Sequence, residues 1–228
     1  MKTIGIIGGL SWHSSLQMYE YINRYVAEHL GEYNCAKVVL ANVNLQEIFV
    51  TRKDEQELVM LEGAKQIEAA GCDFYMICSN TMHKHVPFLE KHVSTPILHI
   101  ADATADEILT RGINKIGLMG TRITMESDFY RGRLESKGLN VIIPEEEDRA
   151  FIDHVLMTET GVGIVKEESA QKFYEIGQRL VNAGAEGVIL GCTEIGMLMQ
   201  QDHTDIPLFD TTIIHSETAA RMAIEEDL

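Results

Sequence analysis

Short runs of Ile, Val and Leu alternate along the chain with longer stretches in which apolar residues recur at helical spacing. The apolar runs are continuous, which is typical of strands covered on both faces of a sheet. Strands that alternate with helices predict βα units and a parallel sheet. We expect strands at 3–8, 37–43, 74–78, 97–100, 115–119, 140–143, 187–190 and 208–209, and helices at 14–30, 54–70, 82–91, 103–111, 125–136, 145–157, 168–183 and 212–226.

The second half of the sequence repeats the first half. Three pairs of strand-flanking residues recur in the same order, 111 to 113 positions apart: Gly8 with Gly120, Ser79 with Cys192, and Pro96 with Pro207. The repeat predicts an α/β protein of two lobes related by a pseudo-twofold axis, each a parallel sheet flanked by helices. Because ligands gather at the carboxyl ends of parallel strands, we expect the active site in the cleft between the lobes. Ser79 and Cys192 would then meet opposite faces of one small molecule, which suits chemistry at a stereocentre.

The composition is that of an ordinary globular protein of 228 residues, with 45% hydrophobic and 24% charged residues. The formal net charge of −16 argues against nucleic acid as a partner, because a phosphate backbone is bound by clustered Lys and Arg. We find no apolar run of membrane-spanning length and no leader, so we expect neither a membrane association nor export. The four cysteines lack the spacing of a disulfide scaffold, which predicts a cytoplasmic protein with reduced thiols.

Two features that resemble cofactor or metal sites do not meet the requirements of such sites. The glycines of residues 5–9 do not form the G-x-G-x-x-G pattern of dinucleotide binding. His83, His85 and His92 lack a carboxylate or thiol at ligand spacing, and we expect them to cap helices or to face water. The residues therefore indicate neither a metal nor a bound cofactor.

Cys192 is the strongest candidate for reactive chemistry. It follows a buried strand and precedes the helix-like residues 193–195. Free N–H groups and the dipole at a helix N-terminus stabilise a thiolate, so we expect the thiol pKa to be lowered toward neutrality, where a thiol can take and return a proton. A small buried residue in a tight turn is the alternative interpretation, and the match with Ser79 in the repeat favours the functional one.

Four segments, residues 8–12, 78–83, 120–121 and 191–195, together resemble the aspartate/glutamate racemase superfamily. The resemblance covers essentially the whole chain and is closest to the aspartate racemase branch. It implies a cofactor-independent 1,1-proton transfer on a small acidic amino acid such as aspartate or glutamate. In that reaction one residue removes the Cα proton and its partner protonates the opposite face. The resemblance also implies a homodimer.

The sequence departs from the family pattern at Ser79, which stands where a cysteine typically precedes Asn-Thr. A hydroxyl is a far weaker acid than a thiol, so Ser79 is a poor general base without a helper. The neighbouring Cys78 should point to the other side of the strand, and it matches Gly191 in the repeat. We expect a lopsided racemase in which Cys192 does most of the proton transfer. The alternatives are a single-thiol lyase or isomerase of the same superfamily and a non-catalytic amino-acid-binding protein.

Nine residues are expected to contact the substrate: Leu10, Ser11, Arg52, Asn80, Thr81, Met82, Thr121, Lys166 and Thr193. Asn80, Thr81 and Thr193 offer amide and hydroxyl groups at helix starts, and Thr121 follows Gly120 in the same way. Such residues also cap helix N-termini, and the two roles can coexist because a capped N-terminus is an anion site.

The resemblance places a cation for the substrate carboxylate at Lys166 and near Arg52, with Lys53 as the alternative to Arg52. Arginine can bind a carboxylate bidentately and lysine binds it as a point charge. The competing interpretation is a solvated charge beside acidic neighbours. In a chain this acidic, any cation near the cleft gains weight if the ligand is an anion.

The resemblance also implies that the C-terminal helix returns to the first lobe. We therefore expect a first lobe of residues 1–98 and 211–228 and a second lobe of residues 99–210. His215, in the returning segment, recurs in the family but has no evident role in proton transfer. Aspartate and glutamate differ by one methylene, which is worth only about 1–3 kcal/mol in a pocket, so no motif selects between them.

Overall fold

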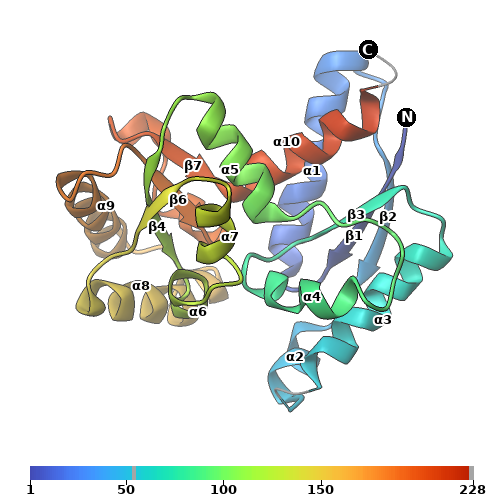
Figure 1. Ribbon diagram of the computed structural model, residues 1–228, viewed down its shortest axis with the longest axis horizontal. Helices are drawn as coiled ribbons and strands as arrows, with labels where there is room; N and C mark the ends of the chain where they lie inside the picture. Colours follow the sequence, from blue (N-terminus) through green and yellow to red (C-terminus); the bar gives the residue numbers. More distant parts are fainter. Residues whose placement is uncertain (53–54, 226–228) are drawn as a thin grey trace. The chain divides into compact units, whose positions relative to one another are not determined.

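The computed structural model describes residues 1–52 and 55–225, and the chain divides into two compact units (Figure 1). The first unit holds Met1–Ile100 together with the segment from His215 onward, and the second holds Ala101–Ile214. In each unit a parallel sheet is flanked by helices. The predicted α/β class with two parallel sheets is confirmed.

The first unit is built on three parallel strands in the order β2-β1-β3. Ile7, Tyr75 and Ile77 pack in a core that includes residues of α3 and α4. Ile4 and Ile6 are also buried, so both faces of the sheet are covered, as the continuous apolar runs predict. The elements are β1 (Thr3–Gly8), α1 (Trp12–Leu30), β2 (Lys37–Asn42), α2 (Leu45–Val50), α3 (Gln56–Ala69), β3 (Phe74–Ile77), the 3₁₀ helix η1 (Thr81–His85) and α4 (Val86–Leu89).

The second unit has four parallel strands in the order β5-β4-β6-β7. Its elements are α5 (Ile100–Thr110), β4 (Lys115–Gly120), α6 (Arg122–Glu126), α7 (Arg131–Ser136), β5 (Asn140–Ile142), α8 (Glu146–Thr158), η2 (Thr160–Val162), α9 (Glu167–Asn182), β6 (Val188–Gly191), η3 (Thr193–Met197), η4 (Gln201–His203) and β7 (Leu208–Asp210). The final helix α10 spans Thr211–Ile224. The second unit thus repeats the strand order of the first and extends it by β7.

The strand register makes the repeat exact at the ends of the central strands. Ile7 of β1 pairs with Ile77 of β3, and Gly120 of β4 pairs with Gly191 of β6. Continuing the first pairing by one residue sets Gly8 opposite Cys78. Gly8 corresponds to Gly120 in the repeat, so Cys78 corresponds to Gly191. Ser79 and Cys192 are therefore equivalent positions, two residues beyond the last paired residue of β3 and one residue beyond that of β6.

Three of the expected elements differ in the structure. The strand expected at 97–100 is a single bridge between Tyr75 and Ile97, and α5 already begins at Ile100. The helix expected at 82–91 is divided into η1 and α4 because Pro87, in the first turn of α4, has no N–H to continue the preceding turn. The helix expected at 125–136 is divided because Ser127 adopts extended backbone, with φ −99° and ψ 146°. Two expected helix ends, the start at residue 54 and the end at residue 226, lie outside the described ranges.

Two helices connect the units in sequence. Helix α5 begins with Ile100 in the first unit and continues in the second, whereas α10 begins in the second unit and continues from His215 in the first. Near the end of α10, Ala223 accepts a hydrogen bond from the N–H of Lys2 at 2.8 Å, which ties this helix to the start of β1. The last helix of each repeat is therefore counted with the other unit.

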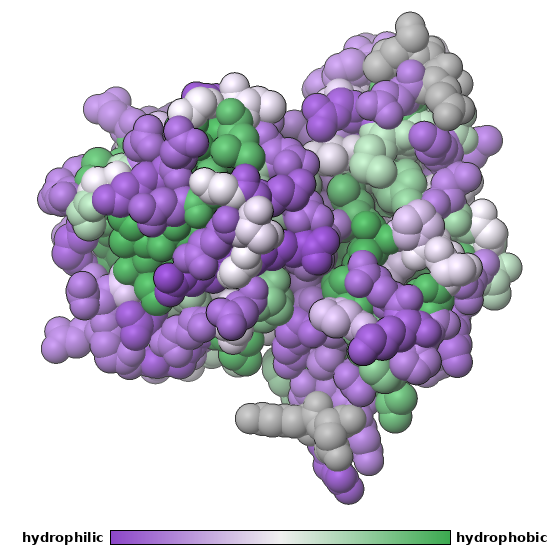
Figure 2. Space-filling model, viewed as in Figure 1, coloured by the Kyte–Doolittle hydropathy of each residue, from purple (hydrophilic) through white to green (hydrophobic). Residues whose placement is uncertain are grey.

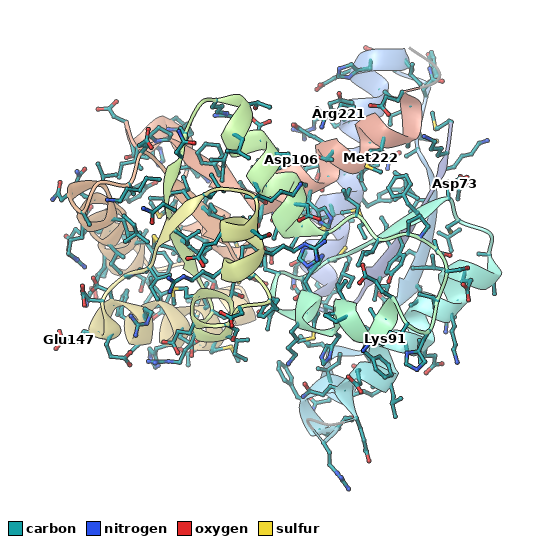
Figure 3. All side chains as sticks on the ribbon, viewed as in Figure 1. Asp73, Lys91, Asp106, Glu147, Arg221 and Met222 are labelled. Atoms are coloured by element: carbon teal, nitrogen blue, oxygen red, sulfur yellow. The ribbon has the colours of Figure 1, made fainter. Side chains whose placement is uncertain are left out.

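Polar and charged side chains cover most of the face shown in Figure 2. Among the residues labelled in Figure 3, Asp73 accepts a hydrogen bond from the N–H of Thr3 at 2.6 Å, and Asp106 of α5 pairs with Lys137 at 2.9 Å. Within the described ranges, no helix is both long and apolar enough to cross a lipid bilayer.

Replacing Gly9 with Ala should destabilise the first unit more than replacing Gly71 with Ala. Both glycines have positive φ, +80° and +73°, but a Cβ on Gly9 would lie 1.9 Å from the carbonyl oxygen of Val43, whereas a Cβ on Gly71 meets nothing within 4 Å. We expect Gly71→Ala to cost about 1–2 kcal/mol for its left-handed backbone and Gly9→Ala to cost ~3 kcal/mol or more. Urea unfolding followed by the fluorescence of the single tryptophan, Trp12, measures both. Equal losses would show that the Gly9 turn is not closely packed.

Candidate active site

Each unit has two polar turns at the carboxyl ends of neighbouring central strands, where ligands collect in parallel sheets. We call residues 8–11 and 79–82 the first half-site. We call residues 120–121 and 192–194 the second half-site. These turns contain most of the substrate-contacting residues expected from the sequence.

The turn after β1 is held by Ser15 of α1. The hydroxyl of Ser15 accepts the N–H of Gly9 at 2.9 Å and donates to the carbonyl oxygen of Ser11 at 3.1 Å. Ser11 is the N-cap of α1, and its hydroxyl accepts the N–H of Ser14 at 3.5 Å. The side chain of Leu10 is buried in the core, so a contact with substrate at this position would come from the backbone.

Ser79 begins the second turn of the first half-site and is half-buried. Its hydroxyl oxygen accepts the N–H of Met82 at 3.3 Å, which leaves the hydroxyl proton for another acceptor. Asn80 is buried, Thr81 is half-buried, and the side chain of Met82 packs against the core of the unit. The turn therefore has two half-buried hydroxyl residues, Ser79 and Thr81, next to the packed side chain of Met82.

Cys78 comes one residue after the end of β3 and is buried. The residue is 1% exposed and lies beside Ser15. Burial raises the pKa of the Cys78 thiol to about 12, and the hydrogen bond with Ser15 offsets only part of that rise. Cys78 is therefore a core residue and does not replace the missing thiol at position 79.

The second half-site contains a thiol paired with a carboxylate. The Sγ–H group of Cys192 donates to Oε2 of Glu194 at 2.9 Å, and the hydroxyl of Thr193 donates to the same oxygen at 2.7 Å. The expected lowering of the Cys192 pKa is wrong. Burial raises this pKa well above its usual value, and the negative charges of Glu194 and Asp153 raise it further. The segment that follows is a 3₁₀ helix of only 5 residues. Its dipole is weaker than that of a longer α-helix and does not offset the rise in the pKa of Cys192.

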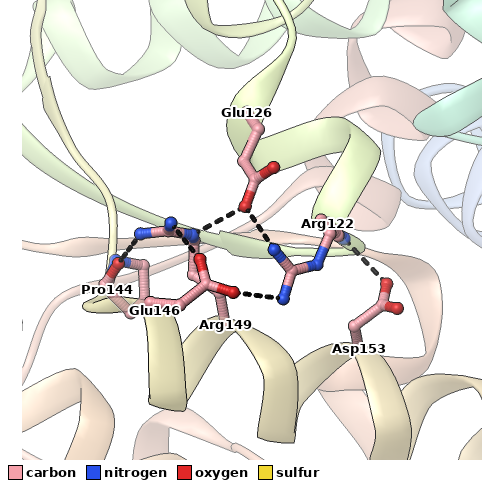
Figure 4. Close-up of polar contacts among 6 residues, drawn as sticks. All are labelled: Arg122, Glu126, Pro144, Glu146, Arg149 and Asp153. Atoms are coloured by element: carbon pink, nitrogen blue, oxygen red, sulfur yellow. Dashed lines mark hydrogen bonds and ion pairs between the residues drawn. The ribbon is translucent and has the colours of Figure 1, made fainter.

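Thr121 is fixed by hydrogen bonds on both sides. Its hydroxyl accepts the N–H of Thr124 at 3.3 Å, and the next N–H, that of Arg122, donates to Asp153 at 2.8 Å (Figure 4). The guanidinium of Arg122 pairs with Glu126 and Glu146. Arg149 pairs with the same two carboxylates, as Figure 4 shows. These pairs join α6 to α8 and keep the charge of Asp153 next to the Thr121 turn.

The two expected cations each pair with a nearby carboxylate. Lys166 Nζ lies 2.9 Å from Glu159 Oε1, and the hydroxyl of Ser169 donates to the other oxygen of that carboxylate at 2.7 Å. The hydrogen bond from Lys166, followed by that from Ser169, lowers the pKa of Glu159. The side chain of Arg52 is 73% exposed and lies 3.8 Å from Glu55. Lys53 lies outside the described residues.

Sequence reasoning missed three side chains that matter to these turns. Glu194 stands two residues after Cys192, and an acidic residue so close to a thiol could have been recognised as its hydrogen-bond acceptor. Asp153 comes from α8, and only the fold brings it near. His83 was expected to cap a helix or face water, yet its side chain is fully buried. His85 is also buried, and only His92 of the three is exposed. In the described part of the chain, no group of three or more His, Cys, Asp or Glu side chains could hold a metal ion.

A family model described as Asp/Glu/Hydantoin racemase matches residues 7–219. The chain belongs to this family. A crystal structure of a candidate Asp/Glu racemase from Yersinia pestis is 40% identical, with a TM-score of 0.92, and covers 98% of this chain and 100% of that one. An aspartate racemase homologue from Pyrococcus horikoshii OT3 is 31% identical, with a TM-score of 0.86 over 98% of this chain and 99% of that one.

Among curated proteins, the broad specificity amino-acid racemase RacX from Bacillus subtilis (strain 168) is 23% identical over 92% of each chain. Together with the two structures, this match confirms the resemblance drawn from the motifs, including the aspartate racemase branch. The expectation of an isomerase is confirmed at the level of the family.

Replacing Glu194 with Gln should lower the pKa of Cys192. The carboxylate raises this pKa both by its charge and by accepting the thiol proton, so the neutral amide should increase the thiolate fraction. We expect alkylation of Cys192 by iodoacetamide at pH 8 to accelerate by roughly threefold to tenfold, measured by mass spectrometry of the peptide that contains it. Glu175→Gln, on the exposed face of α9, is the matched control. A rate that falls or stays the same would contradict the assigned pairing.

Proposed function

We propose that the protein is a cofactor-independent amino-acid racemase acting on aspartate or glutamate. In this proposal the two half-sites face each other across one substrate, with Cys192 as the main acid and base and Ser79 opposite. The observation that carries the proposal is the thiol–carboxylate pair of Cys192 and Glu194 at the position equivalent to Ser79. The names of the relatives support the class of reaction and of substrate.

The proton transfers balance with these side chains and solvent water. Glu194 takes the proton of the Cys192 thiol, and the thiolate then removes the Cα proton from the enantiomer that presents it to this side. The carbanion takes a proton on its other face from the hydroxyl of Ser79, or from a water molecule held there. Glu194 then gives its proton to solvent and the oxygen that lost its proton regains one from solvent, which restores the starting state. Because the pKa of Cys192 is raised, the thiol holds its proton until a substrate arrives. The positive ammonium group of a bound amino acid would favour the thiolate.

The two directions of the reaction should have unequal rates. A hydroxyl is a much weaker acid than a thiol, so Ser79 removes a Cα proton poorly even when it delivers one. Loss of an acid or base partner typically costs 10²–10⁴-fold in rate. The proposal is therefore a lopsided racemase, fast from the enantiomer that Cys192 deprotonates and slow from the other.

The substrate would be bound through the turns and through two cations. Asn80, Thr81, Thr121 and Thr193 supply amide and hydroxyl groups, and Leu10, Ser11 and Met82 supply backbone groups, in the half-sites described above. Lys166 and Arg52 would bind the two carboxylates of an acidic amino acid, each shared with a carboxylate of the protein. Such cations carry particular weight in a chain with a formal net charge of −16.

We further propose that the protein works in the cytoplasm and as a homodimer, with a first lobe of residues 1–98 and 211–228 and a second lobe of residues 99–210. The cytoplasmic assignment rests on the unpaired cysteines and the homodimer on the family resemblance. Sedimentation of the purified protein measures the oligomeric state directly.

The proposal is tested by hydrogen exchange at Cα in D₂O, followed by NMR on separate samples of L- and D-aspartate and of L- and D-glutamate, with chirality assayed alongside. We expect exchange with inversion, faster from one enantiomer, and loss of that exchange in Cys192→Ala without loss of fold. Cys35→Ala, at an exposed free cysteine, is the control and should leave exchange unchanged.

Other outcomes of this experiment identify the alternatives. Exchange from one enantiomer without inversion would indicate a single-thiol enzyme and contradict racemisation. No exchange from any of the four amino acids, with a shift in melting temperature on adding one of them, would indicate an amino-acid-binding protein. At a hundredfold excess over Kd, binding stabilises the fold by about 2.7 kcal/mol, which such a shift reports.

A further inference from the structure

His83 connects the Ser79 turn to the start of helix α5. Its ring is fully buried, and its Nδ1 lies 2.7 Å from the carbonyl oxygen of Ser79. On the other side of the ring, Nε2 accepts the N–H of Ile100 at 3.2 Å. One side chain thus joins the residue proposed to face the substrate to the first residue of a helix that continues in the second unit.

The partners of the ring define its protonation. A carbonyl oxygen can only accept, so Nδ1 carries a proton. The N–H of Ile100 can only donate, so Nε2 carries none. The ring is therefore the neutral tautomer with its proton on Nδ1. Buried rings of His99 and His215 lie against it, with centroids 4.5 and 5.7 Å away, so the ring has little room to turn.

In the second repeat, a carboxylate instead of an imidazole binds the backbone N–H groups at the start of the corresponding helix. The position equivalent to His83 is Gly196, four residues after Cys192. A Cβ on Gly196 would lie 2.7 Å from Oδ2 of Asp210, so the carboxyl group of Asp210 occupies the space beside this glycine. Oδ1 of Asp210 accepts the N–H groups of Thr212 and Ile213, at the start of α10. In both repeats, a side chain beside the reactive turn binds the first N–H groups of the helix that passes to the other unit.

We propose that His83 is a positioning residue for the reaction at Ser79, an inference that rests on the proposed function. The hydrogen bond from Nδ1 holds the carbonyl group of Ser79 and with it the direction of the hydroxyl. The hydrogen bond to Nε2 fixes that turn relative to α5. His83 itself is buried beneath the turn and acts only through Ser79.

Two substitutions separate the two hydrogen bonds. Asn places an amide N–H close to the position of Nδ1 and keeps the bond to Ser79, whereas Gln places an amide oxygen close to Nε2 and keeps only the bond to Ile100. We expect His83→Gln to slow the Cα exchange that depends on Ser79 by roughly 10- to 100-fold, as a misplaced group does. Exchange from the enantiomer that Cys192 deprotonates should change less than threefold. His83→Asn should retain most of the exchange that depends on Ser79 and most of the exchange that depends on Cys192.

Three controls make the result specific to position. His92→Gln removes an exposed histidine whose Nδ1 makes the same contact with a carbonyl four residues earlier, that of Phe88 at 2.8 Å, and should change nothing. Ser79→Ala identifies which exchange depends on Ser79. In the Ser79→Ala background, His83→Gln should have almost no further effect, because the group that it positions is absent. The ¹⁵N shifts of the imidazole in the wild-type protein should show a proton on Nδ1 alone.

Several results would overturn the inference. They are an unchanged exchange in His83→Gln, equal losses from both enantiomers, an additive effect in the Ser79→Ala background, or a ring protonated on Nε2. If His83→Gln does not melt cooperatively, His83→Asn and the ¹⁵N shifts decide in its place. A wild-type protein without exchange on any of the four amino acids would overturn the proposed function and this inference together, whereas an active enzyme without the selective loss overturns the inference alone.

Discussion

The pairing of the first strand of each repeat with the third strand fixes where the reactive side chains stand. Parallel pairing aligns β1 with β3 and β4 with β6, and in this register Ser79 and Cys192 occupy equivalent positions. A slip of one residue would exchange Ser79 with the buried Cys78 and turn its side chain to the other face of the sheet. The chemistry of both half-sites, their capped turns and the helices that cross between the units all depend on this register.

Negative charge around the reactive thiol gives the second half-site its character. Glu194 and Asp153 join burial in raising the pKa of Cys192, and the ion pairs around Arg122 keep Asp153 in place. A thiolate at the start of a long helix would be stabilised before any substrate arrives. Here the raised pKa favours the protonated thiol, and the proposed reaction uses the adjacent carboxylate as the acceptor of that proton when a charged amino acid binds. In the proposed reaction, Glu194 would therefore accept the thiol proton as well as raise the pKa of Cys192.

Seven of the eight strands predicted from periodicity are present in the structure. A continuous apolar run between two helical segments is typical of a buried strand in a parallel sheet. The segment at 97–100 makes a single bridge, at Ile97, whereas its counterpart in the second repeat pairs over three residues as β7. Repeat spacing alone identified Ser79 and Cys192 as equivalent. The position of Cys192 before a helix-like segment gave the wrong direction for its pKa, because that pKa depends on burial, on Glu194 and on Asp153, which is distant in sequence. His83 was misread for the same reason, since its partner Ile100 lies 17 residues away along the chain.

A crystal structure of the protein with aspartate bound tests the central claim most directly. The account predicts a single amino acid whose Cα lies between Ser79 Oγ and Cys192 Sγ, about 3–3.5 Å from the sulfur, with its carboxylates on the turns and cations of both half-sites. An aspartate bound to one half-site only, or one whose Cα is beyond the reach of Cys192, would contradict it.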